Sequence, residues 1–326
     1  MSASTDDWRP GASAERLRRR AGMLAEIRAF FATRGLLEVD TPQLVNSAVT
    51  DVNIHSAEVR WPGGDGRPRY LHTSPEYAMK RLLAAGSGDI YQMCHVFRGE
   101  EQGQLHNSEF MIVEWYRRGW AFAALMEEVD ALLRQLLRGA SLAATRYLSY
   151  EQAFIEALDC NPLTDSDDAL AARARRAGFE EALLQHCDRD ELLDLLMGLR
   201  VGPQLGTDGP VFVHRYPASQ AALARLDPAD PRVALRFELY LRGVELANGF
   251  EELGDGQEQR QRFAADQRLR AARNLPVPAI DEYLLAALAA GLPPCAGVAL
   301  GFDRLLMLAC RAERIDEVIA FTSERA

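Results

Sequence analysis

The sequence has almost no lysine and an excess of acidic residues. Of its 37 basic residues only Lys80 is a lysine, and 47 acidic residues leave a net charge of −10. Because each contacted phosphate needs a cation, this balance argues against a protein that coats a nucleic acid without sequence preference. A bias toward arginine codons is the simplest explanation of the missing lysines, although Lys80 lies within the dense polar segment 74–80.

Cysteine and histidine patterns that would hold a metal are also missing. The five cysteines include no C-x-x-C pair, and the six histidines form no H-x-x-x-H motif. A structural zinc site is therefore not expected. An odd number of cysteines in a chain of 326 residues, which needs no disulfide to hold its core, is typical of a reducing cytoplasm.

No segment of the sequence predicts a membrane span. The first 20 residues lack the apolar core of a signal peptide. The uncharged run 283–302 is long enough to cross a bilayer, but Pro293 and Pro294 would interrupt a spanning helix. We interpret this run as a buried helix, a turn and a buried strand, and we expect no membrane association.

The composition is that of a globular protein. Apolar residues make up 48% and charged residues 26% of the chain, which excludes a disordered chain, a collagen and a coiled-coil rod. Periodicity and capping residues predict helices at 13–34, 121–138, 256–273, 281–290 and 302–312, strands at 36–39, 91–98, 109–116, 211–214, 233–241, 243–250 and 296–301, a hairpin turn at 63–66 and a helical insertion at 149–200. Because these elements do not alternate as βαβ units do, we expect an α+β fold with a largely antiparallel sheet flanked by helices.

The loop between the strands at 91–98 and 109–116 carries the densest group of functional side chains. Arg98 ends the first strand, where its planar guanidinium can bind a phosphate through two hydrogen bonds. Glu100 can accept a hydrogen bond from an exocyclic amino group, and Phe110 can stack on a purine. Taken alone, a surface Arg–Glu pair beside a core phenylalanine is the simpler explanation of these residues.

Two further segments place charge where a nucleotide could bind. Small residues on a buried strand at 297–301 allow a ligand to approach closely, and Asp303 is expected to cap the helix that follows. Arg304 in the first turn of that helix opposes the helix dipole, and a bound anion would offset this cost. Glu245 and Glu252 are carboxylates flanked by apolar residues, a pair that suits Mg²⁺ bridging to phosphates.

Together these motifs resemble the class II aminoacyl-tRNA synthetases. Phe-Arg-x-Glu followed by His-x-x-x-Phe, at 97–110, resembles their motif 2, and Gly-x-x-x-Gly-x-Asp-Arg, at 297–304, resembles their motif 3. The segment 35–42 is similar to motif 1, whose proline lies in the dimer interface. The segments 245–253 and 74–80 resemble the lysyl-tRNA synthetases. The resemblance implies a class II synthetase catalytic core.

A closer resemblance is to the elongation factor P β-lysine ligases, a family of lysyl-tRNA synthetase paralogues. It rests on Ser-Pro-Glu-Tyr at 74–77, Glu-Trp-Tyr at 114–116, Pro-Ala-Ser-Gln at 217–220 and Gly-Val-Ala-Leu-Gly at 297–301. The 34 residues that precede motif 1 are too few for the five-stranded barrel with which lysyl-tRNA synthetases read the anticodon. We therefore expect a single catalytic domain over 1–326 without an anticodon-binding OB-fold. The chain departs from that family at Gly99, Ser108, Val113 and Glu251, where Asn, Pro, Leu and His are common.

The resemblance implies two groups of site residues. It assigns ATP to Arg98, Gly99, Glu100, Asn107, Phe110, Glu245, Leu246, Gly301 and Arg304. Arg98, on the α-phosphate, and Arg304, on the γ-phosphate, are the catalytic residues. It assigns the amino acid to Ser74, Glu76, Tyr116 and Glu252, and Mg²⁺ to Glu245 and Glu252. Acidic residues suit a lysine-like substrate because it carries two ammonium groups.

The implied reaction is the activation of (R)-β-lysine as an adenylate and its transfer to a lysine ε-amine of elongation factor P, by a cytoplasmic homodimer that needs no tRNA. Ala299 stands where lysyl-tRNA synthetases usually have glycine. One methyl group, worth about 1–3 kcal/mol, is enough to favour a β-amino over an α-amino acid. Three alternatives stay open: a minimal enzyme that charges tRNA, a catalytically inactive paralogue, and an asparagine-synthetase-like ligase that transfers to ammonia.

Overall fold

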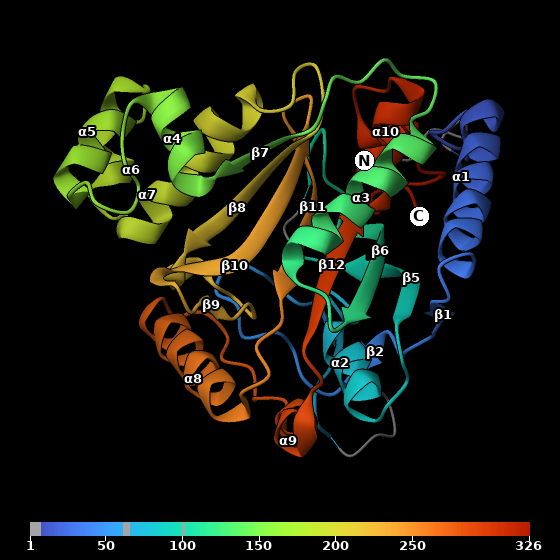
Figure 1. Ribbon diagram of the computed structural model, residues 1–326, viewed down its shortest axis with the longest axis horizontal. Helices are drawn as coiled ribbons and strands as arrows, with labels where there is room; N and C mark the ends of the chain where they lie inside the picture. Colours follow the sequence, from blue (N-terminus) through green and yellow to red (C-terminus); the bar gives the residue numbers. More distant parts are fainter. Residues whose placement is uncertain (1–7, 61–65, 100–101) are drawn as a thin grey trace.

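The computed structural model describes residues 8–60, 66–99 and 102–326 (Figure 1). Within these residues the centre of the molecule is a nine-stranded sheet in the order β1-β5-β6-β12-β11-β10-β8-β7, with β9 paired to β10. The pairs β1–β5 and β7–β8 are parallel, and the other neighbours are antiparallel. The strands are β1 (Leu37–Glu38), β5 (Ile90–Phe97), β6 (Glu109–Arg118), β7 (Arg146–Ser149), β8 (Val211–Pro217), β9 (Leu226–Asp227), β10 (Asp230–Leu241), β11 (Val244–Glu251) and β12 (Cys295–Gly301).

Helices on one side of this sheet enclose the main hydrophobic core. They are α1 (Ala14–Ala32), α3 (Phe122–Leu136) and α10 (Phe302–Cys310), and in Figure 1 α3 crosses over the middle of the sheet. A second group lies at the bottom of that view, where α2 (Glu76–Ala84) packs against α9 (Glu282–Gly291) and α9 packs against α8 (Gly256–Ala272).

The predicted helical insertion forms a unit of its own beside β7 and β8 (Figure 1). It contains α4 (Tyr150–Leu158), α5 (Asp167–Arg176), α6 (Glu181–Leu184) and α7 (Arg189–Leu196), followed by a π-helical turn (Met197–Val201) and a 3₁₀ turn (Gly202–Gln204). A separate cluster of buried apolar side chains joins these helices to the sheet edge. The insertion therefore extends the sheet's edge without entering the main core.

The structure confirms the α+β fold and the largely antiparallel sheet. It also contains a three-stranded sheet of β2 (Leu44–Val45), β4 (Arg69–Leu71) and β3 (Glu58–Val59) that the sequence did not predict. Runs of two or three residues are too short to show the alternation of a strand. Most of the turn predicted at 63–66 lies outside the described residues. Among the described helices, none combines the length and the apolar composition needed to cross a bilayer.

The prediction that Asp303 caps α10 is wrong. Gly301 is the N-cap, and Asp303 lies in the first turn of the helix. The Asp303 carboxylate accepts a hydrogen bond from Met111 N at 2.7 Å and forms an ion pair with Arg20 of α1. Since Asp303 is only 2% exposed, this contact ties α1, β6 and α10 together and fixes the helix that carries Arg304.

The two faces of the sheet differ because side chains alternate along a strand. Val113, Trp115 and Val298 point into the main core beside α3. The opposite face carries most of the polar residues, in rows that run from β5 across β6, β12 and β11 to β10. One row is Gln92, Glu114, Ala299, Asn248 and Glu238, and the next is Ile90, Tyr116, Gly297, Phe250 and Arg236.

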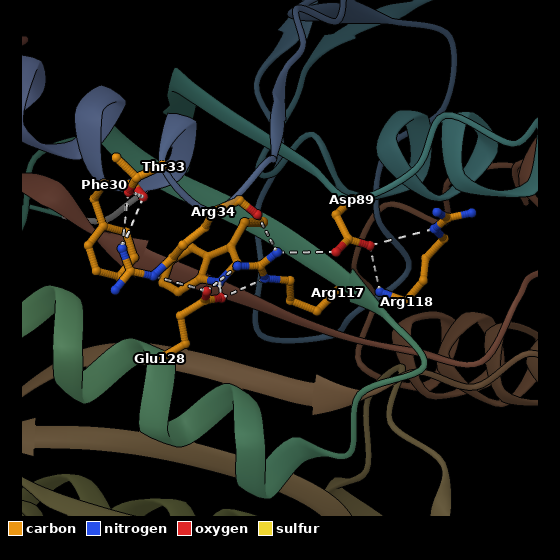
Figure 2. Close-up of polar contacts among 8 residues, drawn as sticks. Phe30, Thr33, Arg34, Asp89, Arg117, Arg118 and Glu128 are labelled. Carbon is orange, nitrogen blue, oxygen red and sulfur yellow. Dashed lines mark hydrogen bonds and ion pairs between the residues drawn. The ribbon is translucent and has the colours of Figure 1, made fainter.

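A buried ion-pair network joins α1, β6 and α3 at the end of β6 (Figure 2). Arg117 Nε donates to Glu128 Oε2 at 2.9 Å, and Arg117 Nη2 also pairs with this carboxylate. Trp115 Nε1 donates to the same carboxylate at 3.1 Å. Arg117 Nη1 reaches Asp89 Oδ2 at 3.1 Å and the carbonyl of Arg34 at 3.3 Å. The network fixes the end of a strand that carries part of the polar face.

Candidate active site

Arg304 contacts two segments that are distant from it in the sequence. Its Nη1 donates to Glu245 O at 3.1 Å and its Nε to Leu105 O at 3.3 Å. Its Nη2 lies 2.7 Å from His106 Nε2. The guanidinium therefore sits between β11 and the loop that links β5 to β6. The arginine predicted from motif 3 and the histidine of motif 2 are in direct contact.

Arg98 lies at the start of the same loop, directly after β5. Its backbone N donates to Ser108 O at 2.9 Å, so the two ends of the loop are held together. Its guanidinium carbon lies 5.2 Å from the centre of the Phe110 ring, a cation–π distance. The fold therefore brings the predicted phosphate-binding arginine beside the aromatic ring that was predicted to stack on the base.

The pKa of Glu245 responds to charges of both signs around it. Burial raises the pKa of Glu245 to about 7, and the negative charge of Glu238 contributes to this rise. The positive charges of Arg304, Arg236 and Arg98 lower it. The element that the two predicted catalytic arginines share is the β5–β6 loop: Arg304 contacts Leu105 O and His106 within it, and Arg98 N bonds Ser108 O at its end.

The other residues predicted to bind ATP belong to the same region. Gly99 N donates to His55 O at 2.7 Å, which holds the start of the loop. Leu246 is buried in β11, and Gly301 caps the helix of Arg304. Glu100 lies outside the described residues.

The side chain of Asn107 is already engaged by the protein. Its Nδ2 donates to Glu109 O at 2.6 Å, and its Oδ1 accepts from Ser323 N at 3.1 Å. The amide therefore attaches the C-terminal segment to the start of β6. These two bonds leave one N–H and one oxygen lone pair of the amide for a contact with the base.

Three of the four residues predicted to bind the amino acid meet at Glu114. Ser74 Oγ donates to Glu114 Oε2 at 2.7 Å and accepts from Glu76 N at 2.9 Å. Tyr116 OH donates to Glu114 Oε1 at 2.7 Å. Burial, together with the charge of Glu76, raises the pKa of Glu114 to about 8. A buried carboxyl of this kind gains most from a cationic ligand.

Glu252, the fourth residue, is joined to Glu76 by Lys80. The Lys80 ammonium lies 2.7 Å from Glu76 Oε1 and 2.6 Å from Glu252 Oε2, and its side chain is 1% exposed. Burial by itself would lower the pKa of Lys80, but Glu252 and Glu76 raise it above its usual value. Lys80 is therefore charged. Lys80 already pairs with Oε2 of Glu252, which leaves the other oxygen of this carboxylate for a further ligand.

Gly297 allows Tyr116 and Glu252 to come together. A Cβ atom at Gly297 would lie 2.3 Å from Tyr116 Cε1 and 2.5 Å from Glu252 Oε1. Only a residue without a side chain leaves room for both over β12. The contacts therefore close into a ring, which we call the acidic ring, made of Ser74, Glu76, Lys80, Glu114, Tyr116 and Glu252.

Sequence reasoning assigned no role to Glu114 and Lys80, although both had a signal. Glu114 precedes Tyr116 by two residues on a strand, so the two share a face. Lys80 follows Glu76 by four residues on a helix, which places the two side chains together. Glu251, in contrast, stays outside the acidic ring, because it pairs with Arg225.

Known proteins with similar sequences belong to the family that these motifs resemble. The sequence model of the family described as tRNA synthetases class II (D, K and N) matches residues 3–325. An elongation factor P–(R)-beta-lysine ligase of Pectobacterium carotovorum is 50% identical over 327 residues, covering 99% of this chain and all of the relative. The proteins of that name from Erwinia tasmaniensis and Edwardsiella ictaluri are 51% and 52% identical, with at least 98% of each chain covered. The chain therefore belongs to the class II tRNA synthetase family, and within it to the elongation factor P–(R)-beta-lysine ligases.

Proposed function

We propose that the protein activates (R)-β-lysine with ATP and transfers it to a lysine ε-amine of elongation factor P, releasing pyrophosphate and AMP. The observation that carries this proposal is the arrangement along β11. Glu245, near the start of this strand, accepts a hydrogen bond from Arg304 through its backbone oxygen, and Glu252, directly after the end of the strand, belongs to the acidic ring. Seven residues of strand, at about 3.3 Å each, separate Glu245 from Glu252 by roughly 23 Å. The triphosphate would therefore lie toward Glu245 and the amino acid at the acidic ring, with its carboxylate facing the α-phosphate.

In this reaction the protein has to position the reactants and to stabilise the negative charge that develops on the phosphate. A carboxylate oxygen of the amino acid attacks the α-phosphorus in line, and pyrophosphate leaves with the electrons of the broken P–O bond. The acceptor amine then attacks the carbonyl carbon, a C–N bond forms, the amine loses a proton and AMP leaves. Arg98 and Arg304 would stabilise the charge that develops on the phosphate oxygens in the first step. Neither step needs a covalent enzyme intermediate.

A magnesium ion fits the phosphate end better than the acidic ring. No group of three or more His, Cys, Asp or Glu side chains within the described residues is arranged to hold a metal by itself. Mg²⁺ at nucleotide sites commonly uses one or two carboxylates and takes its other ligands from phosphates and water. The half-buried Glu245 would serve as such a carboxylate, and a bound ion would supply positive charge to the triphosphate.

The acidic ring would recognise the amino groups of the substrate. The ring contains three carboxyl groups and one ammonium: Lys80 pairs with Glu76 and Glu252, and Glu114 bonds the hydroxyls of Ser74 and Tyr116, so the ring can accept further positive charge. This fits a substrate with two ammonium groups and fits a transfer to ammonia, as in an asparagine-synthetase-like ligase, poorly. The proposal includes a cytoplasmic homodimer without a tRNA acceptor, as the family resemblance implies.

Intact-mass measurement of elongation factor P tests the proposal. After incubation with this protein, ATP and each lysine isomer, we expect one added lysyl group, with the highest yield from (R)-β-lysine and none without ATP. Acceptor protein with its target lysine replaced by arginine is the control. Unmodified acceptor together with acylated tRNA would support the tRNA-charging alternative. Absence of ATP–pyrophosphate exchange with any lysine isomer would support an inactive paralogue.

Ala299 is expected to set the preference for a β-amino acid. In its row of the sheet Ala299 lies between Glu114 and Asn248, so its methyl group takes up space beside the acidic ring. We expect Ala299→Gly to shift the kcat/KM ratio of (R)-β-lysine to α-lysine by about tenfold toward α-lysine. The measurement is adenylation kinetics with both isomers. Ala296→Gly removes the same methyl group on the core-facing side of β12 and should leave the ratio unchanged; a ratio that Ala299→Gly also leaves unchanged would contradict this role.

A further inference from the structure

Lys80, the single lysine of the chain, forms ion pairs with two carboxylates of the acidic ring, Glu76 and Glu252. It bonds one oxygen of each, Glu76 Oε1 and Glu252 Oε2, and its own side chain is 1% exposed. Glu252 Oε1, the oxygen that Lys80 does not bond, lies over Gly297 beside the Tyr116 ring. Lys80 therefore fixes which oxygen of Glu252 turns toward the sheet face.

The charges of the ring add to a value that matches one class of ligand. Fully ionised, Glu76, Glu114 and Glu252 carry three negative charges against the one positive charge of Lys80, which leaves two negative charges. Because burial raises the pKa of Glu114 to about 8 and that of Glu252 to about 7, the empty ring holds part of this charge as bound protons, which a cationic ligand would displace. A diammonium amino acid brings two positive charges besides its carboxylate. Buried charges are stable only when they are paired, so a site with this balance selects a ligand with two ammonium groups over a ligand with one.

We propose that Lys80 is a positioning and specificity-determining residue for a diammonium amino acid, through its hold on Glu76 and Glu252. The inference rests on the proposed function, because it assumes that the acidic ring receives the amines of the substrate. Without Lys80, two carboxylates would face each other across the ring with no fixed counter-ion. They would separate or share a proton, and the ring would lose the geometry that a second ammonium needs.

Kinetics of Lys80→Met give the first test. We expect the KM for (R)-β-lysine in ATP–pyrophosphate exchange to rise by at least about tenfold, with the KM for ATP unchanged. We also expect the kcat/KM ratio of (R)-β-lysine to norleucine, which has one ammonium group, to fall. Arg270→Met is the matched control, because Arg270 is a buried cation that bonds the carbonyls of Asp51 and Pro276 and touches no residue of the ring. Equal losses for both amino acids, or an equal rise in the KM for ATP, would overturn the inference.

A second test uses the wild-type protein and needs no folded variant. Because Lys80 is the only lysine, protein labelled with ¹⁵N-lysine gives one side-chain ammonium resonance in NMR. We expect this resonance to shift when (R)-β-lysine is added, with the affinity that calorimetry gives, and to stay in place with norleucine. Calorimetric binding without a shift would overturn the role of Lys80 and leave the proposed function intact. No binding of any diammonium amino acid would overturn the proposed function, and the inference with it.

Discussion

Replacement of Arg98 by alanine is expected to reduce the rate of ATP–pyrophosphate exchange by about 10³-fold or more. The amino acid's carboxylate is a weak nucleophile, and its attack builds negative charge on the oxygens of the α-phosphate. Arg98 is the basic side chain at the start of the β5–β6 loop, and its guanidinium lies over the Phe110 ring. Loss of the guanidinium removes charge and hydrogen-bond donors from the transition state, which binding elsewhere in the site does not replace.

The controls separate this effect from unfolding. Arg98→Lys keeps the charge but loses the planar fork, so we expect it to recover only part of the rate. Arg175→Ala removes an exposed arginine that pairs with Glu181 in the helical insertion, and it should leave exchange unchanged. Circular dichroism and the sedimentation coefficient of Arg98→Ala should match those of the wild type. Exchange within tenfold of the wild-type rate would contradict the role of Arg98.

The residues that bind phosphate could be predicted because each lies in a local sequence pattern. Arg98 and Phe110 flank a loop between two strands that the sequence predicts by their β-rich composition. Arg304 follows a glycine-rich strand and begins a helix. What the sequence could not give is the contact between them, because Arg304 meets His106 across a long stretch of chain. Such contacts depend on the order of strands in the sheet, with β12 placed directly beside β6.

The partner of a buried acidic side chain could not be predicted from the sequence. Glu252 was expected to bind Mg²⁺ as well as substrate, and the structure gives it Lys80 as a partner. Asp303 was expected to cap a helix and instead pairs with Arg20. In both cases the partner is a cation from a different element. A pattern within one segment does not show which distant cation will neutralise a buried acid.

The buried ion-pair network around Arg117 is expected to make a large contribution to the free energy of unfolding (Figure 2). Arg117 is 5% exposed and Glu128 is 6% exposed, and the Glu128 carboxylate accepts hydrogen bonds from Arg117 and Trp115. The Arg34 guanidinium lies over the Phe30 ring at 3.5 Å and 3.7 Å from Glu128 Oε1. Glu128 on α3 thus neutralises cations from β6 and from the end of α1.

We expect Glu128→Ala to lower the free energy of unfolding by about 3 kcal/mol, measured by urea denaturation. The loss leaves Arg117 buried with Asp89 as its remaining carboxylate partner, which places the effect near the lower end of the range for a broken buried pair. The double variant Arg117→Met, Glu128→Leu removes both charges and should recover much of the loss, since an apolar pair of similar size leaves no charge unpaired. A loss below about 1 kcal/mol in Glu128→Ala would mean that water reaches Arg117 and that the network is not a closed one. Because the network is on the core side of β6, a stabilised double variant should also keep the wild-type KM for the amino acid, which separates the stability of this strand from the chemistry on its other face.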